Sequence, residues 1–106
     1  MLHRGDEVFN AEDTVNDEPI VGDGVWIEYW EVASGKAIPD NCPCCNDVLD
    51  RTVEGNIHGT HIQLEKRKDS QMYIIPTCNS CNGKHGEKLK IEYVDVILAV
   101  EAIKKQ

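Results

Sequence analysis

Five cysteines in two groups are the residues of this chain best suited to chemistry. The stretch NCPCCN holds Cys42, Cys44 and Cys45, and the stretch TCNSCNG holds Cys78 and Cys81. The number is odd and the N-terminus, MLHRGDEVFN, lacks the apolar run of a secretion signal, so a framework of disulfides is not expected. Metal binding is therefore the leading expectation for these thiols.

The spacing of the cysteines separates four of them from the fifth. Two cysteines with two residues between them can place both sulfurs on one cation while the backbone amides of the turn point at those sulfurs. Cys42 and Cys45 have this gap, with Pro43 inside the turn and Asn46, which tolerates a positive φ, directly after it. The pair in CNSCNG repeats the arrangement, so Cys44 is the spare thiol.

The two pairs together predict one zinc ion held by four thiolates. The expected ligands are Cys42, Cys45, Cys78 and Cys81. Four thiolates complete a tetrahedron and leave no position for water or substrate, so we expect a structural zinc whose binding energy contributes to folding. The open alternatives are a chelate that uses Cys42 and Cys44, free buried thiols, and an iron or iron–sulfur site.

Length and composition favour one small domain with a modest core. The chain has 106 residues, of which 41% are apolar and 6% aromatic, and its formal net charge is -8. Such a charge disfavours non-specific nucleic-acid binding, although Lys66, Arg67 and Lys68 could form a local basic contact at what is otherwise a solvated hairpin tip. No stretch approaches the roughly 20 apolar residues of a membrane span, so we expect a cytoplasmic protein without membrane contact.

The elements that must position the cysteines can be placed approximately. Residues 1–22 are acidic and aperiodic, which predicts a flexible arm or at most a short docked strand near Val21, and residues 23–106 are expected to form the zinc-binding domain. The stretch from Trp26 predicts a short amphipathic helix that ends at Gly35, with both tryptophans facing the core. The stretches HGTHIQL and QMYIIP predict a hairpin between the two cysteine groups.

Two further stretches leave their structure open. Val48-Leu49 with Thr52-Val53 could form a short strand. The segment LKIEYVDVILAVEAIKK predicts either a strand that passes into a helix or two strands, because its first apolar residues alternate and its later ones have helical spacing.

A cysteine turn, a hairpin and a second cysteine turn follow one another as in a treble clef, and residues 40–88 resemble the HNH (His-Asn-His, or His-Me finger) family of zinc-supported nucleases. The matching features are His61 in THI, the run YIIPTC, the CNSCN turn and His85 in GKHG. The resemblance implies that His61 acts as general base toward a water and that His85 or Asn82 holds a divalent ion on the scissile phosphate. It also implies an α+β fold, a small zinc-stabilised treble-clef-like domain with two zinc knuckles flanking a β-hairpin, plus a short N-terminal helix.

The sequence departs from the family motif at two positions. Thr60 stands where the family has an aspartate or histidine, and Met72-Tyr73 stands where its asparagine would fall. His58 cannot easily replace the missing ligand, because three residues along a strand place it on the opposite face from His61. We therefore interpret His61 first as a histidine that forms hydrogen bonds inside the domain or backs the zinc site, with the general base and a substitute zinc ligand as alternatives.

Three functions follow from these observations. The favoured one is a noncatalytic interaction module with a structural four-cysteine zinc site and a protein partner that the sequence does not identify. The second is an HNH-type metal-dependent nuclease that uses His61. The third is an acidic mimic of a phosphate backbone that binds a basic partner, suggested by the acidic N-terminal residues.

Overall fold

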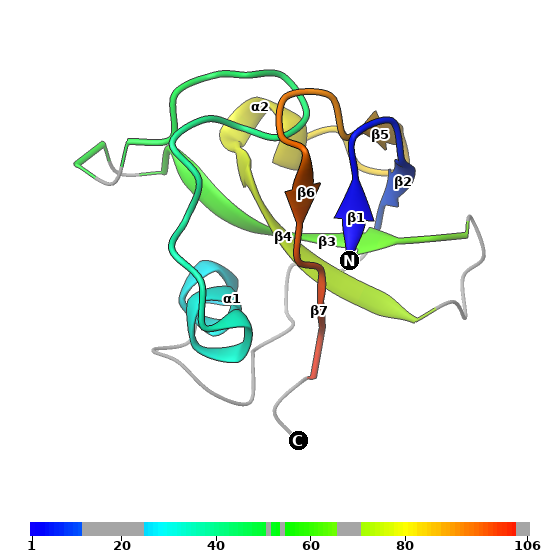
Figure 1. Cartoon of the computed structure of the whole chain (residues 1–106), viewed down its shortest axis with the longest axis horizontal. Helices are drawn as coiled ribbons and strands as arrows, with labels where there is room; N and C mark the ends of the chain where they lie inside the picture. Colours follow the sequence, from blue (N-terminus) through cyan, green and yellow to red (C-terminus); the bar gives the residue numbers. More distant parts are fainter. Residues whose placement is uncertain (12–24, 51, 54, 66–70, 104–106) are drawn as a thin grey trace.

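The computed structural model describes residues 1–11, 25–50, 52–53, 55–65 and 71–103. These residues form, in chain order, β1 (Leu2–His3), β2 (Glu7–Asn10), α1 (Trp26–Ser34), β3 (Ile57–Gln63), β4 (Met72–Cys78), α2 (Asn79–Asn82), β5 (Lys88–Lys90), β6 (Val96–Ile97) and β7 (Val100–Glu101). Five strands form an antiparallel sheet in the order β5-β2-β3-β4-β7, and β1 pairs with β6 (Figure 1). The fold is a small α+β fold, as predicted.

The centre of the sheet is the β3–β4 hairpin between the two cysteine groups. Its register runs from the pair Ile57 and Cys78 to the pair Gln63 and Met72, which confirms the predicted hairpin. Side chains alternate along β3, so His61 lies on one face of the sheet and Thr60 on the other. The predicted hairpin tip, with Lys66, Arg67 and Lys68, lies outside the described residues.

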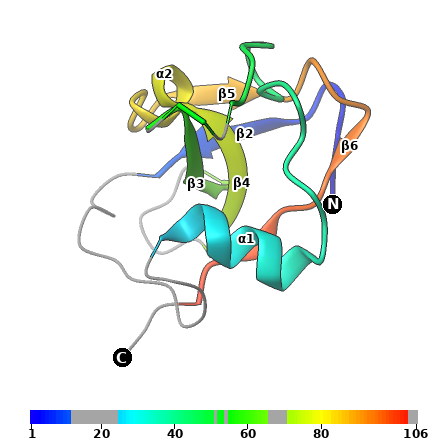
Figure 2. The ribbon, with the colours of Figure 1, turned by 90° about the vertical axis from the view of Figure 1, so that its left-hand side faces the viewer.

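Helix α1 covers the face of the hairpin that carries His61, while α2 lies on the opposite side (Figure 2). The helix ends as predicted at Gly35, whose φ of 66° lets its N–H donate to the carbonyl of Glu31. Trp30 is buried and its Nε1 donates to the carbonyl of Leu98 at 2.7 Å. Trp26 is half-buried, and its ring meets the His61 ring edge-on at 4.5 Å.

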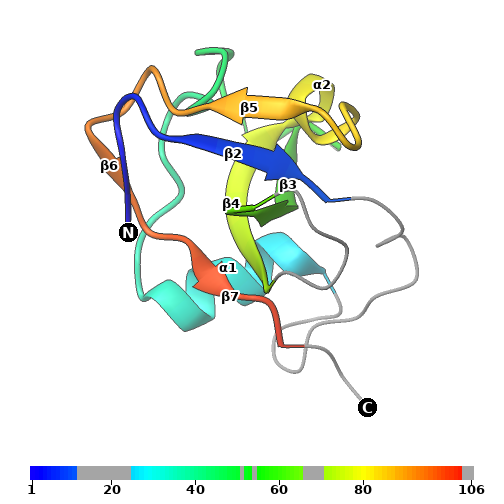
Figure 3. The same cartoon turned by 90° about the vertical axis from the view of Figure 1, so that its right-hand side faces the viewer.

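The expectation of a flexible arm is wrong for residues 1–11. Strand β2 lies between β5 and β3 within the sheet (Figure 3), and Val8 is fully buried at 0% exposure. Along β2, polar Glu7 and Asn10 flank only two apolar residues. So short a pattern is a weak signal for a strand, and the acidic composition of the segment instead favours an arm. Residues 12–22, including the alternative strand near Val21, lie outside the described residues.

The C-terminal segment forms strands in its described part. Leu89 is buried in β5, and Ile91 is buried directly after it. The later apolar residues, whose spacing also suited a helix, form β6 and β7 instead. The short strand proposed for Val48 to Val53 is absent from its described residues, because Val48 forms only a single bridge with Asn41. Neither helix among the described residues has the length and apolar character needed to cross a bilayer.

Candidate metal centre

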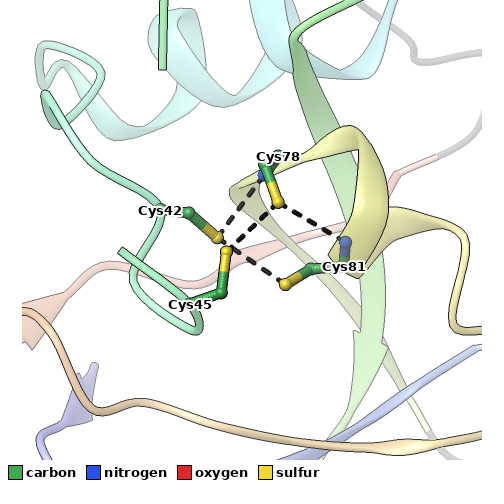
Figure 4. A group of neighbouring side chains, drawn as sticks. All are labelled: Cys42, Cys45, Cys78 and Cys81. Atoms are coloured by element: carbon green, nitrogen blue, oxygen red, sulfur yellow. Dashed lines mark hydrogen bonds between the residues drawn. The ribbon is translucent and has the colours of Figure 1, made fainter. Parts of the chain in front are cut away.

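Four cysteines from distant parts of the chain meet in one cluster. Their sulfur atoms all lie within 4.8 Å of one another, and the residues are Cys42, Cys45, Cys78 and Cys81. Figure 4 shows the four sulfurs pointing toward a common centre, two from the loop before β3 and two from the junction of β4 and α2. These are the four residues that the spacing selected, and together they could hold a metal ion.

The first pair is held by a tight turn. The N–H of Cys42 donates to the carbonyl of Asp47 at 2.7 Å, and the N–H of Asn46 donates back to the carbonyl of Cys42 at 2.9 Å. Asn46 adopts a φ of 69°, the left-handed conformation that asparagine tolerates better than most residues. Asn41 closes the turn by donating from Nδ2 to the carbonyl of Asn46 at 2.9 Å.

The second pair sits where β4 becomes α2. Cys78 precedes the first residue of α2, and its Sγ accepts a hydrogen bond from the N–H of Cys81 at 3.5 Å. The N–H of Cys78 donates to Cys42 Sγ, also at 3.5 Å. Backbone amides therefore point at sulfurs both within a pair and between the pairs, which is the pattern that stabilises thiolate charge.

The cluster has dimensions that suit zinc. A zinc–sulfur distance of about 2.3 Å places the sulfurs of a tetrahedral site about 3.8 Å apart. Cys42 Sγ lies 3.9 Å from Cys81 Sγ, and Cys45 Sγ lies 3.3 Å from Cys78 Sγ. These two distances lie on either side of the tetrahedral value, and all four sulfurs are within 4.8 Å of one another.

The pKa values of the cluster thiols are shifted in ways that a bound cation would offset. A hydrogen bond with the Cys44 side chain lowers the pKa of Cys42 to about 4, although burial opposes this shift. Burial raises the pKa of Cys45 to about 12, and burial together with the Cys42 charge raises the pKa of Cys81 well above its usual range. The negative charge of the Cys42 thiolate thus disfavours ionisation of the neighbouring thiols, and a bound divalent cation would offset this repulsion.

Cys44 is half-buried beside the cluster and is not one of its four members. Its hydrogen bond with Cys42, followed by burial, raises the pKa of the Cys44 thiol well above its usual range. Cys44 therefore contacts Cys42, a candidate ligand, as a neutral thiol, in the position expected for the spare cysteine.

The residues suggested for nuclease chemistry are separated. His61 is 6% exposed beneath Trp26 on the α1 face of the sheet. Asn82 accepts a hydrogen bond through Oδ1 from Thr60 on the opposite face, and His85 is exposed in the loop after α2. His58 points away from His61, as its spacing predicted, and its Nε2 contacts the carbonyl of Gly55 at 2.9 Å.

Two of the described lysines near the second cysteine pair, Lys88 and Lys90, lie close to carboxylates. Lys88 lies 3.3 Å from Glu7, and Lys90 lies 3.7 Å from Glu92. Both pairs are exposed and weak, but each brings a carboxylate next to an ammonium group. The local positive potential that a phosphate backbone would need is thereby reduced.

Two contacts around the cluster have no obvious sign in the sequence. The carbonyl of Pro43 accepts hydrogen bonds from the N–H groups of Glu92 and Tyr93, each at 3.0 Å. Asn10, in the segment expected to be an arm, donates to backbone carbonyls of α2. Neither contact could be predicted, because each joins segments that are far apart in the chain and depends on the sheet topology.

Comparisons with known proteins do not assign this chain to a family. No family model matches the sequence, and no curated protein or solved structure matches it significantly.

Proposed function

We propose that the protein is a noncatalytic interaction module whose small treble-clef-like domain is stabilised by one structural zinc ion. The observation that carries this proposal is the convergence of four sulfurs within 4.8 Å from two Cys-x-x-Cys pairs. When bound, zinc would saturate its coordination with four thiolates and supply folding energy rather than a reactive water.

The order of the elements supports the treble-clef-like assignment. A cysteine turn precedes the β3–β4 hairpin, and the second pair follows at its end, with Cys78 as the last residue of β4 and Cys81 in α2. In this arrangement a bound metal would join the first cysteine turn to the open end of the hairpin. At that end, Cys78 is the last residue of β4 and pairs with Ile57 at the start of β3.

The placement of the histidines supports a noncatalytic role. A general base must reach a substrate-bound water, and a metal ligand must share a site with it. His61 lies under Trp26, whereas the Asn82 side chain contacts Thr60 on the other face of the sheet. We propose a protein partner, because the net charge is -8 and Lys88 and Lys90 are each close to a glutamate.

Metal analysis tests the zinc centre. Elemental analysis of the purified protein should find one zinc per chain, and removal by a strong chelator should abolish the cooperative thermal transition. Restoring zinc, but not magnesium, should restore it, since magnesium prefers oxygen ligands. A thermal transition that is the same with and without the chelator would contradict the proposal.

A cleavage assay tests the noncatalytic role separately. The zinc-loaded protein is incubated with plasmid DNA in magnesium, manganese or nickel, beside a His61→Ala variant. We expect no cleavage above background from either protein. Cleavage by the unmodified chain that the His61→Ala variant loses would establish the nuclease alternative instead.

A further inference from the structure

Asn10 joins β2 to α2, the short helix that contains Cys81 and directly follows Cys78. Its side chain is 3% exposed, and Nδ2 donates to the carbonyl of Cys81 at 2.9 Å and to the carbonyl of Asn82 at 3.0 Å. Its backbone is bound to the loop before β5, because its N–H donates to the Glu87 carbonyl and its carbonyl accepts from the N–H of Gly86, both at 2.8 Å. The amide is thus fixed against one of the candidate ligands.

Helix α2 needs such a contact. It spans only Asn79–Asn82, and so short a helix has little stability of its own. The last carbonyls of a helix lack partners within it, and buried carbonyls are costly to leave without hydrogen bonds. Asn10 donates to two of these carbonyls from a strand about seventy residues away in the chain. The Cys81 carbonyl also accepts from the N–H of Lys84 at 3.2 Å, so Asn10 adds a shorter, long-range contact to a local one.

A second set of hydrogen bonds holds α2 from the hairpin. Thr60 Oγ1 donates to Asn82 Oδ1 at 3.0 Å and lies 2.6 Å from Thr77 Oγ1. Thr77 in turn donates to the carbonyl of Cys78 at 3.1 Å. The two hydroxyls have two protons for these three contacts, so a given proton can alternate between partners. Thr60 and Thr77 are fully buried at 0% exposure. The backbone of both cysteines in the second pair is therefore restrained by buried polar side chains.

We propose that Asn10 is a positioning residue for the metal centre, which orients Cys81 through the carbonyls of α2 and makes β2 part of the support of the bound ion. This inference rests on the proposed zinc site. Groups outside the ligand set that fix the orientation of ligands typically change metal affinity by about 10- to 100-fold when removed. Thr60 also helps to hold α2 in place, through its hydrogen bond to the Asn82 side chain.

The test compares Asn10→Ala with Tyr29→Phe in the full-length, zinc-loaded protein. Tyr29 is a matched control: it is also buried, and its hydroxyl also forms hydrogen bonds with distant backbone, at Glu101 and Ile103, but it does not contact α2. The measurements are the rate of zinc transfer to a chromogenic chelator and the visible spectrum after cobalt substitution. The spectrum reports the geometry of the four-sulfur site rather than the stability of the fold.

We expect Asn10→Ala to transfer zinc about 10- to 100-fold faster and to change the cobalt spectrum, while Tyr29→Phe leaves both within about twofold of the unmodified protein. Equal zinc transfer from the two variants with an unchanged cobalt spectrum would overturn the role of Asn10. If Asn10→Ala does not fold, Asn10→Leu decides, since it keeps a similar volume and removes the amide that donates to α2; unchanged zinc transfer from it would overturn the proposal. Unmodified protein that binds no zinc would instead refute the zinc site itself.

Discussion

At the scale of single residues, the crowded stretch around Cys44 shows how neighbours with the same chemistry take different roles. Cys42 and Cys45 point into the four-sulfur cluster, whereas Cys44 contacts Cys42 from outside it. The two-residue spacing was sufficient to make this distinction, because it reflects how a short turn directs its side chains. The hydrogen bond from Cys44 to Cys42 depends on packing and could not be read from the spacing.

The roles of the three cysteines can be separated by substitution with serine. We expect Cys44→Ser to keep one zinc per chain, because the serine hydroxyl can still donate to Cys42. Cys45→Ser should lower zinc affinity by more than the about 10- to 100-fold typical of outer contacts, because it removes a ligand. Competition with a chelator of known affinity measures both. Loss of zinc from Cys44→Ser with retention by Cys45→Ser would reverse the assignment.

Gly59 is the residue whose substitution should most directly disturb the packing of α1. A Cβ atom added there would lie 2.3 Å from the backbone carbonyl carbon of Trp26, which cannot rotate away. Gly59→Ala should therefore lower the free energy of unfolding by about 1–3 kcal/mol or more. Gly83→Ala is the control, since its nearest contact is an ordinary 3.5 Å to the carbonyl oxygen of Asn79. Denaturant unfolding of the zinc-loaded variants checks the difference, and equal stabilities would contradict this packing.

At the scale of elements, prediction succeeded where the signal was local. The helix from Trp26 and its end at Gly35 follow from apolar spacing and one left-handed residue, and the β3–β4 hairpin follows from two apolar runs. Prediction failed for β2, because its place in the sheet depends on pairing with β3 and β5, which are distant in sequence. For the same reason, the four cysteines of the cluster were predictable from their spacing, but the hydrogen bonds from Asn10 to α2 were not.

The buried position of β2 can be tested with one side chain. Val8 is fully buried between β3 and β5, so Val8→Ala should destabilise the protein by about 2 kcal/mol from lost apolar burial and the cavity that remains. Glu7→Ala, on the same strand but exposed, should change stability by less than about 0.5 kcal/mol. Denaturant unfolding with zinc in excess compares them. Equal stabilities would mean that residues 7–10 behave as the flexible arm that their composition suggests.

At the scale of the whole molecule, the cysteine cluster lies where four parts of the chain meet. The loop with the first pair contacts the C-terminal segment through Pro43, the second pair lies at the junction of β4 and α2, and β2 reaches α2 through Asn10. Three of the four cysteines of the cluster are also members of the buried core. A bound metal would therefore stabilise contacts between segments rather than one local loop, and its loss should affect the entire sheet.

Zinc binding should depend strongly on pH, because protons and zinc compete for the same sulfurs. Without a cation, Cys42 has a pKa of about 4 and is a thiolate at neutral pH, whereas the raised pKa values of Cys45 and Cys81 keep them protonated. Zinc must displace at least those two protons, so its affinity should rise with pH by about tenfold per unit for each proton released. On acidification these sulfurs regain their protons first, and Cys42 follows only as the pH falls through about 4, so the stability contributed by zinc is lost as the pH falls.

The proton count is measured by calorimetric titration of zinc at pH 7 in two buffers with different ionisation enthalpies. The difference in apparent binding enthalpy gives the number of protons released, and repeating the titration at pH 6 and pH 8 gives the change in affinity. Cys44→Ala is an informative control: it keeps the four cysteines of the cluster but removes the main contact that lowers the Cys42 pKa, so that pKa should rise and more protons should be released when zinc binds. Release of fewer than one proton by the unmodified protein would show that the cluster is already ionised before the metal binds, against the ionisation states argued from burial and charge.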